Sequence, residues 1–244
     1  MKIVSYNLRL GGKAGARAHW QRIFEATAAD IFLVQETRSP DRYASEAEWP
    51  ALRSRVHWSS VPNITWGSAI YLRSGRWRAI DLDRFKGYVV GVELMGPKLE
   101  GMTRRPLRVF SLHVPSPYKR PMHEILDRIA ALPNAQRCDH IIGGDFNLTT
   151  GVRHPTERRQ VHDLWLLDRM RREFNLLNAW QVANPNRNLP QTLRWGKDHS
   201  EPYHCDAIFL PAAWYRYLES CEVISGPDWD ALSDHNPVVA SLSF

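Results

Sequence analysis

The chain has 244 residues, of which 43% are hydrophobic, and its formal net charge is +6 at pH 7. This length and apolar content predict a single domain over residues 1–244 with a large core. The ten tryptophans follow no fixed period, which excludes a solenoid or propeller, and no apolar run approaches the ~18 residues of a membrane span. The positive charge favours a polyanionic partner.

Cysteine usage and the N-terminus bear on the cellular compartment. Cys138, Cys205 and Cys221 are odd in number and lack C-x-x-C spacing, which is typical of reduced thiols in an intracellular protein. No basic-then-apolar leader precedes Lys2, where the first strand is predicted to begin. We therefore expect a soluble cytoplasmic monomer that does not act at membranes.

The first predicted elements are a strand, a helix and a strand. Residues 2–6 form an apolar strand, a glycine-rich loop follows at residues 11–15, and apolar residues then recur at helical spacing. The next strand covers residues 31–35. Residues 40–50 are expected to form a short helix or an irregular segment that ends at Pro50.

Strand-like runs follow and predict an antiparallel meander. They cover residues 56–58, 68–72, 77–80, 88–92 and, beyond a loop at residues 96–106, residues 107–112. Pro121 can open a helix, because its fixed φ suits a first helical turn. Apolar residues from Met122 to Ile129 then give that helix one buried face.

The C-terminal part of the sequence mixes strands and helices. A strand at residue 141 is followed by helical runs at residues 161–173 and 178–184, a helix start at Pro211, and strands at residues 206–210, 222–224 and 238–242. This mixed order predicts an α/β (α+β) fold with two β-sheets packed face to face and helices outside. We expect residues 1–115 to build one half and residues 135–244 the other.

Polar side chains lie at the ends of several predicted strands. The clearest case is residues 141–147, where two isoleucines and two glycines lead into Asp145, Phe146 and Asn147. By itself this pattern also fits a β-turn capped by Asx side chains. Other strand ends or starts carry Asn7, Glu36, His113, Asp206 and the pair Asp234 and His235. Because strand ends converge when strands share one sheet or two stacked sheets, these side chains are predicted to line one rim.

Six short motifs occur in a fixed order along the chain. They are Ser5-Tyr6-Asn7, Gln35-Glu36-Thr37, Ser111-Leu112-His113, Gly144-Asp145-Phe146-Asn147, Cys205-Asp206-Ala207-Ile208-Phe209 and Ser233-Asp234-His235-Asn236-Pro237. Together they resemble the exonuclease/endonuclease/phosphatase superfamily, which includes DNase I, abasic-site endonucleases, neutral sphingomyelinases and inositol polyphosphate 5-phosphatases. The resemblance covers nearly the whole chain. It implies a DNase I-like, four-layer α/β/β/α sandwich with the active site at one end, between the two sheets.

The resemblance also implies a metal site for phosphate-ester hydrolysis. Glu36 would bind Mg²⁺, or Mn²⁺ in its place, with Asn7 beside it. Asp234 would contact the metal directly or through water. Carboxylate and amide oxygens are the ligands that such hard cations prefer. A structural carboxylate or a capping amide at a strand end is the alternative for these residues.

The remaining motif residues are expected to carry the chemistry. Asp145 would orient and deprotonate the attacking water, and Asn147 would hold that water or a phosphate oxygen. His235 would donate to a phosphate oxygen, with Asp206 fixing its tautomer and charge. His113 would stabilise the leaving group or the phosphate. A polar turn or a core histidine is the alternative interpretation.

Basic and aromatic residues near the motifs are candidates for the substrate surface. Arg38 matches the position where DNase-like members of the family place a groove-contacting basic residue. Two basic loops are predicted to flank the rim, since arginine suits phosphate. They contain Arg104 and Arg105 and, further on, Arg153, His154, Arg158 and Arg159. Tyr203 and Trp229 are predicted to stack on a base or sugar, with core packing as the alternative.

The sequence therefore predicts a Mg²⁺-dependent phosphodiesterase that acts on nucleic acid. The favoured substrate is DNA, which the enzyme would cleave as an endonuclease or an exonuclease. One alternative keeps the enzyme but changes the substrate to a phospholipid or small phosphate ester, as in the sphingomyelinases. The Pro-x-x-Cys-Asp spacing that ends at Asp206 resembles the motif of the inositol phosphatases. That motif has an arginine where this chain has Ala207, which counts against a phosphatase. A second alternative is a non-catalytic nucleic-acid-binding module.

Overall fold

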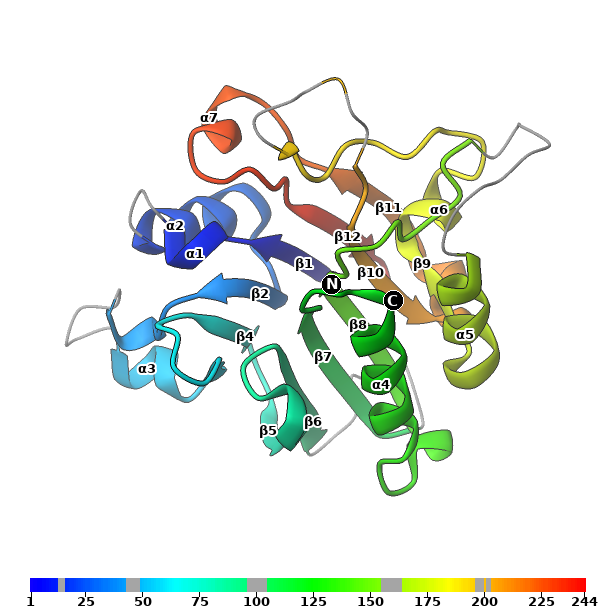
Figure 1. Cartoon of the computed structure of the whole chain (residues 1–244), viewed down its shortest axis with the longest axis horizontal. Helices are drawn as coiled ribbons and strands as arrows, with labels where there is room; N and C mark the ends of the chain where they lie inside the picture. The colour runs from blue at the N-terminus through cyan, green and yellow to red at the C-terminus, as the bar shows by residue number, and fades with distance from the viewer. Residues whose placement is uncertain (13–15, 43–48, 96–104, 155–163, 196–199, 201–202) are drawn as a thin grey trace.

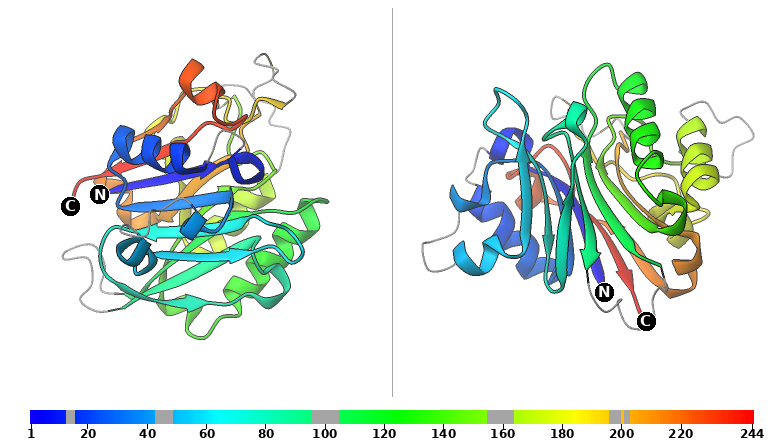
Figure 2. Two further views of the ribbon diagram at one scale, coloured as in Figure 1. Left: turned by 90° about the vertical axis from the view of Figure 1, so that its left-hand side faces the viewer. Right: turned by 90° about the horizontal axis from the view of Figure 1, so that it is seen from below.

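The computed structural model describes residues 1–12, 16–42, 49–95, 105–154, 164–195, 200 and 203–244. Two six-stranded sheets pack face to face, with helices on their outer surfaces (Figures 1 and 2). The predicted DNase I-like α/β sandwich is thus confirmed. Among the helices in these residues, none is long and apolar enough to cross a membrane.

The first sheet has the strand order β11-β12-β1-β2-β4-β3. Its strands are β1 (Lys2–Asn7), β2 (Ile31–Thr37), β3 (Val56–Ser60), β4 (Gly67–Leu72), β11 (Leu218–Val223) and β12 (Val238–Leu242). The second sheet has the order β5-β6-β7-β8-β10-β9. Its strands are β5 (Arg76–Ile80), β6 (Val89–Met95), β7 (Leu107–His113), β8 (Asp139–Asp145), β9 (Leu176–Asn178) and β10 (Asp206–Pro211).

This order corrects two sequence-based predictions. The single meander is wrong, because β3 and β4 pair in the first sheet while β5, β6 and β7 pair in the second. The division into an N-terminal and a C-terminal half is also wrong, because β11 and β12 return to the first sheet beside β1. Both sheets therefore combine strands from distant parts of the chain.

The helices lie mainly on the outer faces of the sheets (Figure 2). They are α1 (Arg9–Gly12), α2 (Ala16–Thr27), α3 (Trp49–Arg53), α4 (Lys119–Ala130), α5 (Leu164–Phe174), α6 (Ala179–Ala183) and α7 (Pro227–Asp230). The 3₁₀ turns are Pro40–Arg42, Asp83–Phe85, Ala135–Arg137 and Ala212–Tyr217. Pro50 lies near the start of α3 instead of ending a segment, because the first turn of a helix does not need the missing N–H.

Two strand–helix–strand units set the direction of the central strands. β1 and β2 are parallel and joined through α2, and β7 and β8 are parallel and joined through α4. A parallel pair needs a crossover of this kind, and both strands then end at the same edge of the sheet. Each pair thus ends at one edge of its own sheet, and the contact between Asn7 at the end of β1 and Asp145 at the end of β8 shows that both edges lie at the same end of the sandwich.

Three apolar clusters hold the layers together. The first fills the space between the sheets and includes Leu33, Ile141 and Ile208. The second joins the outer face of the second sheet to α4 and α5, and the third joins the first sheet to α2. In α4 the buried residues are Met122, Ile125, Leu126 and Ile129, at the spacing predicted for one helical face. β8 is covered on both faces, as its continuous apolar run suggests.

Candidate active site

Three neighbouring strands of the second sheet place polar side chains in one row. β7 and β8 pair so that His113 lies beside Asp145, and β10 pairs with β8 so that Asp206 lies opposite Asp145. Asp145 is 2% exposed and Asp206 is fully buried. The row results from strand register, because residues that are paired across adjacent strands share one level of the sheet.

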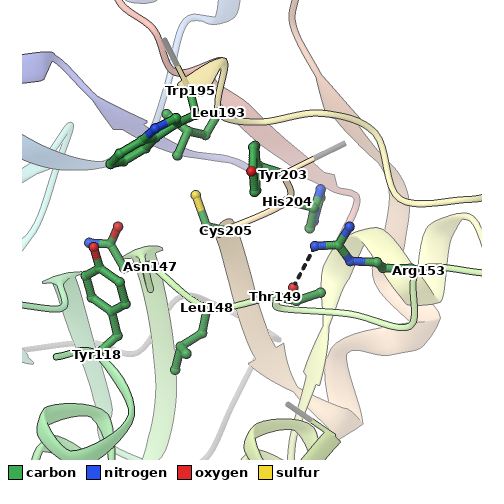
Figure 3. A pocket seen from close by; sticks show the side chains of 10 residues that line it. All are labelled: Tyr118, Asn147, Leu148, Thr149, Arg153, Leu193, Trp195, Tyr203, His204 and Cys205. Atoms are coloured by element: carbon green, nitrogen blue, oxygen red, sulfur yellow. Dashed lines mark hydrogen bonds between the residues drawn. The ribbon is translucent and has the colours of Figure 1, made fainter. Parts of the chain in front are cut away.

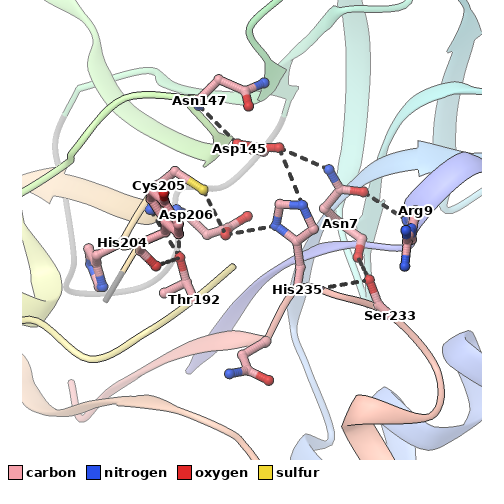
Figure 4. Close-up of polar contacts among 12 residues, drawn as sticks. Asn7, Arg9, Asp145, Asn147, Thr192, His204, Cys205, Asp206, Ser233 and His235 are labelled. Atoms are coloured by element: carbon pink, nitrogen blue, oxygen red, sulfur yellow. Dashed lines mark hydrogen bonds and ion pairs between the residues drawn. The ribbon is translucent and has the colours of Figure 1, made fainter. Parts of the chain in front are cut away.

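The first sheet brings Asn7 and Glu36 to the same place from the ends of β1 and β2. The amide Nδ2 of Asn7 donates to Glu36 Oε1 at 3.1 Å and to Asp145 Oδ2 at 3.0 Å. Its Oδ1 accepts from the backbone N–H of Arg9 at 2.8 Å, so the nitrogen, and not the oxygen, faces the carboxylates. Asn7 thus joins the two sheets at the site (Figure 4).

Backbone conformations that L-residues seldom adopt cluster at this end. Arg9, Leu10, Glu36 and Asn147 all have positive φ, between 49° and 54°. At Glu36 the register of β2 against β4 also shifts. The turned backbone lets the Leu10 N–H donate to Glu36 Oε2 at 2.5 Å. Such strain persists only where surrounding contacts fix it, and it is frequent at functional sites.

His235 and Asp206 form a buried pair across the two sheets. His235 Nδ1 lies 2.9 Å from Asp206 Oδ2, and His235 Nε2 lies 3.7 Å from Asp145 Oδ2. Burial opposes a charge on the imidazole, but the Asp206 and Asp145 carboxylates outweigh it and raise the pKa of His235 to about 10. Burial raises the pKa of Asp206 as well. The pair therefore retains one proton at neutral pH, and His235 Nε2 is a donor.

Residues that the sequence analysis missed hold this pair in place. Arg194 is 3% exposed; its guanidinium donates to Asn236 Oδ1 at 2.5 Å and to the Ser233 carbonyl at 2.6 Å. Thr192 Oγ1 accepts from the backbone N–H groups of Cys205 and Asp206 at 3.0 and 3.1 Å. Arg194 and Thr192 belong to a segment without regular strand or helix pattern, so no periodicity indicated them.

His113 and Asn147 complete the rim. His113 Nε2 lies 3.5 Å from Glu36 Oε1 and 3.9 Å from Asp145 Oδ2, and its ring packs near Trp66. The backbone N–H of Asn147 donates to Asp145 Oδ1 at 2.9 Å, and its Nδ2 donates to the Val114 carbonyl at 2.9 Å. With the nitrogen engaged, the amide offers its oxygen as an acceptor.

The partner of Asp234 is a cation of this chain. Arg9 Nε lies 3.0 Å from Asp234 Oδ2. The other oxygen, Oδ1, is buried and accepts no hydrogen bond from the described residues. Arg9, two positions past the Asn7 motif, was not predicted as a site residue.

The donor set fits a hard divalent cation at Glu36. Glu36 and Asp145 bring carboxylates from different sheets to one amide nitrogen, and oxygen donors of this kind suit Mg²⁺. A second group of possible ligand atoms, from Cys205, Asp206 and His235, lies within 4.8 Å of one another. These atoms already bond among themselves, and burial keeps the Cys205 thiol protonated by raising its pKa. We therefore regard that group as a hydrogen-bonded cluster.

A pocket of about 280 Å³ opens beside Asn147 and Cys205 (Figure 3). Tyr203, Trp195 and Arg153 line it; Tyr203 is 38% and Trp195 64% exposed. Arg153 Nη2 donates to Thr149 Oγ1 at 3.3 Å. Tyr203 and Arg153, both predicted for the substrate surface, thus line one pocket together with Asn147 and Cys205, which lie close to Asp145 and Asp206 in the sequence.

The other residues predicted for the substrate surface differ in their exposure and position. Arg38 is exposed just past Glu36, whereas Trp229 is 5% exposed and packs edge-on against Tyr6, so its stacking role is wrong. Arg105 precedes the start of β7, which spans about 20 Å at ~3.3 Å per residue, so Arg105 lies at the opposite end of that strand from His113 and does not flank this rim. Arg104, Arg158 and Arg159 lie outside the described residues.

Buried carboxylates, an imidazole paired with one of them, and oxygen donors that suit a hard cation thus meet at one end of the two-sheet sandwich. Residues 4–235 match the model of the Endonuclease/Exonuclease/phosphatase family, and the chain belongs to that family. It is a hydrolase acting on phosphoester bonds, in a family whose members depend on metal ions.

Solved structures share the fold over the whole chain. An AP endonuclease from Archaeoglobus fulgidus is 15% identical, with a TM-score of 0.66 and coverage of 100% of both chains. The catalytic domain of Xenopus laevis APE2 is 18% identical, with a TM-score of 0.67, covering 99% of this chain and 91% of its own. The endonuclease domain of TRAS1, a telomere-specific non-LTR retrotransposon, is 19% identical, with a TM-score of 0.63 and coverages of 99% and 97%. No curated protein sequence matches significantly.

Proposed function

We propose that this protein is a Mg²⁺-dependent phosphodiesterase that cleaves DNA. The observation that carries the proposal is the meeting of Glu36, Asp145 and His235 at the seam of the two sheets: the Asn7 amide donates to both carboxylates, and His235 Nε2 lies 3.7 Å from Asp145 Oδ2. These are the groups that hydrolysis of a phosphodiester needs: a ligand for a cation, a base for water and a donor to the phosphate.

Each residue has a role that follows from its contacts. A cation held by Glu36 supplies charge neutralisation on the phosphoryl oxygens. Asp145 orients the attacking water and accepts its proton on the carboxylate, whose orientation is fixed by the Asn147 N–H at Oδ1 and the Asn7 amide at Oδ2. The free oxygen of Asn147 accepts from the same water. His235, fixed through Nδ1 by Asp206, donates from Nε2 to a phosphate oxygen.

DNA is favoured as substrate by charge and by the neighbouring structures. The chain carries a formal net charge of +6, which attracts a polyanion. Two of the similar structures are named as endonucleases. Arg38, exposed just past Glu36, and Arg153, in the pocket beside Asn147, are the proposed phosphate contacts, and Tyr203 in the same pocket is the proposed stacking residue.

A substrate panel tests the proposal. Wild type, Asp145→Asn and Asp168→Asn are incubated in Mg²⁺ with supercoiled plasmid, single-stranded DNA, single-stranded RNA, an abasic duplex, sphingomyelin and an inositol polyphosphate. Asp168 is a matched control, because it lies on the surface of α5, where it pairs with Arg172. We expect DNA to be cut by wild type and control, and about 100-fold more slowly by Asp145→Asn.

The other outcomes separate the alternatives. Turnover of lipid or inositol phosphate alone would keep the chemistry and overturn DNA as the substrate. A folded protein that binds DNA and turns over nothing in the panel would point to a non-catalytic nucleic-acid-binding module. Replacing Mg²⁺ by Mn²⁺ or Ca²⁺ in the same assay identifies the ion that supports cleavage.

A further inference from the structure

Arg9 places a fixed positive charge beside a carboxylate that the sequence predicted to bind metal. Its Nε lies 3.0 Å from Asp234 Oδ2; the Arg9 side chain is 40% exposed and that of Asp234 is 17% exposed. Within the described part of the chain, no group accepts a hydrogen bond from the Nη1 or Nη2 of Arg9. The guanidinium therefore neutralises Asp234 and has donors left for a further anion.

The position of Arg9 is built into the site. Its backbone N–H donates to Asn7 Oδ1 at 2.8 Å, and Ser233, next to Asp234, donates through Oγ to the Asn7 carbonyl at 2.8 Å. Arg9 has φ of 54°, and the following residue, Leu10, uses its own N–H to bind Glu36. One short turn thus fixes both the metal ligand Glu36 and the arginine.

Asp234 has the capacity to bind a cation, and Arg9 is the cation that it binds. Its Oδ1 is buried without a hydrogen-bond donor among the described residues, which by itself would suit a metal ion. A divalent cation at that oxygen would lie beside the guanidinium, and two like charges so close to one carboxylate repel each other. The guanidinium also matches a phosphate group in shape and charge.

We infer that Arg9 excludes a second metal ion from Asp234 and acts in its place, so that the site holds one divalent cation, at Glu36, and binds the substrate's phosphate with the arginine. The phosphate contact rests on the proposed function, whereas the number of metal ions is tested without substrate. Arg9 thereby becomes a catalytic residue in direct contact with the phosphodiester.

Metal stoichiometry of the full chain tests this. Mn²⁺ binding is measured by isothermal titration and by electron paramagnetic resonance for wild type, Arg9→Ala, Arg9→Lys and the double variant Arg9→Ala with Asp234→Asn. We expect one ion per chain for wild type, two for Arg9→Ala, and one each for Arg9→Lys and the double variant. Lysine and alanine carry the same backbone strain at φ of 54°, so they form a matched pair.

Other stoichiometries would overturn the inference. Two ions in wild type, falling to one in the double variant, would make Asp234 a metal ligand despite Arg9. If Arg9→Ala binds a single ion and its circular dichroism spectrum equals that of wild type, Arg9 does not exclude a second metal ion.

Kinetics supply the second readout. Arg9→Ala is expected to lower kcat/KM by about 100-fold and Arg9→Lys by less, because losing a hydrogen-bond donor to the phosphate reduces the stabilisation of the transition state. Equal kinetics of Arg9→Ala and wild type would contradict the phosphate contact. If the ion counts agree with the inference but no phosphodiester in the panel is cleaved, the proposed function fails. The conclusion that Arg9, and not a metal ion, is the cation bound by Asp234 then still stands.

Discussion

His235 is the residue whose chemistry depends most on its neighbours. An isolated histidine is largely neutral at pH 7.5, and burial would make it more so. Asp206 reverses this through the 2.9 Å contact with Nδ1, and Asp145 adds to the effect. The imidazolium form, which is able to donate from Nε2, persists until the pH rises toward about 10.

Asp206→Asn should therefore impair catalysis in a pH-dependent way. The amide cannot hold the positive charge on His235, so the pKa of the imidazole falls and the donor is lost at lower pH than in wild type. We expect kcat at neutral pH to fall about 100-fold or more, with the alkaline limb of the kcat/KM profile displaced toward neutrality. A profile that falls in height but keeps the wild-type alkaline limb would contradict this role.

The strand ends are the elements that the sequence predicted best. An apolar run that stops at a polar residue is visible without a structure, and β1, β2, β7, β8 and β12 begin or end within two residues of the predicted positions. The three-residue strand β9 was missed, because Leu176–Asn178 is too short to show a period.

Gly144 shows why β8 ends in paired glycines. It has φ of +144°, and a Cβ there would lie 2.0 Å from the Leu112 carbonyl oxygen of β7. Gly144→Ala should lower the free energy of unfolding by about 3 kcal/mol, since backbone must move to admit the methyl group. Gly75→Ala is the control and should cost about 1 kcal/mol, because Gly75 has φ of +92° and, among the described residues other than its two chain neighbours, no atom lies within 4 Å of an added Cβ. If urea unfolding shows the same loss of unfolding free energy for Gly144→Ala and Gly75→Ala, the Leu112 carbonyl of β7 does not lie this close to Gly144 of β8.

His140, in the same strand, should make stability depend on pH. It is 2% exposed and stacks on Phe110, and burial is the main cause that lowers its pKa to about 4. Because this folded-state pKa lies below the unfolded value near 6.5, its contribution is complete above pH 6.5 and is lost as the pH falls from 6.5 to 4.

His140→Phe removes this titration while keeping an aromatic ring in place. Between pH 7 and pH 5, the variant should lose about 2 kcal/mol less unfolding free energy than wild type. Urea denaturation at the two pH values provides the comparison. The same pH dependence in both proteins would mean that the His140 imidazole already binds protons in the folded state.

For the whole molecule, the sequence predicted that the motifs meet but not how the sheets are assembled. The rim residues converge because β1, β2, β7 and β8 end on one side, as expected from two strand–helix–strand units. Nothing local in β12 indicates that it pairs with β1, because that pairing joins residues more than 200 positions apart, and β11 joins the sheet through β12. The assignment of strands to halves by chain position failed for this reason.

The same limit applies to the site as a whole. Chain spacing alone does not show that Gln35 Nε2 donates to Ser111 Oγ at 2.9 Å across the two sheets, or that Arg9 pairs with Asp234. Such contacts are set by how closely the sheets approach and by unusual backbone angles, which have weak sequence signals for residues other than glycine. The roles assigned to the rim residues, and a cytoplasmic location, stay predictions.

One measurement tests the central claim most directly: the rate at which wild type, Glu36→Gln and Glu222→Gln cleave a DNA duplex in Mg²⁺, with and without excess EDTA. Glu222 is exposed on β11 and serves as the matched control. We predict that EDTA abolishes cleavage, that Glu36→Gln is slower by about 100-fold or more, and that Glu222→Gln equals wild type. Cleavage that survives EDTA, or a Glu36→Gln variant as fast as wild type, would contradict a metal-dependent phosphodiesterase site at the seam of the two sheets.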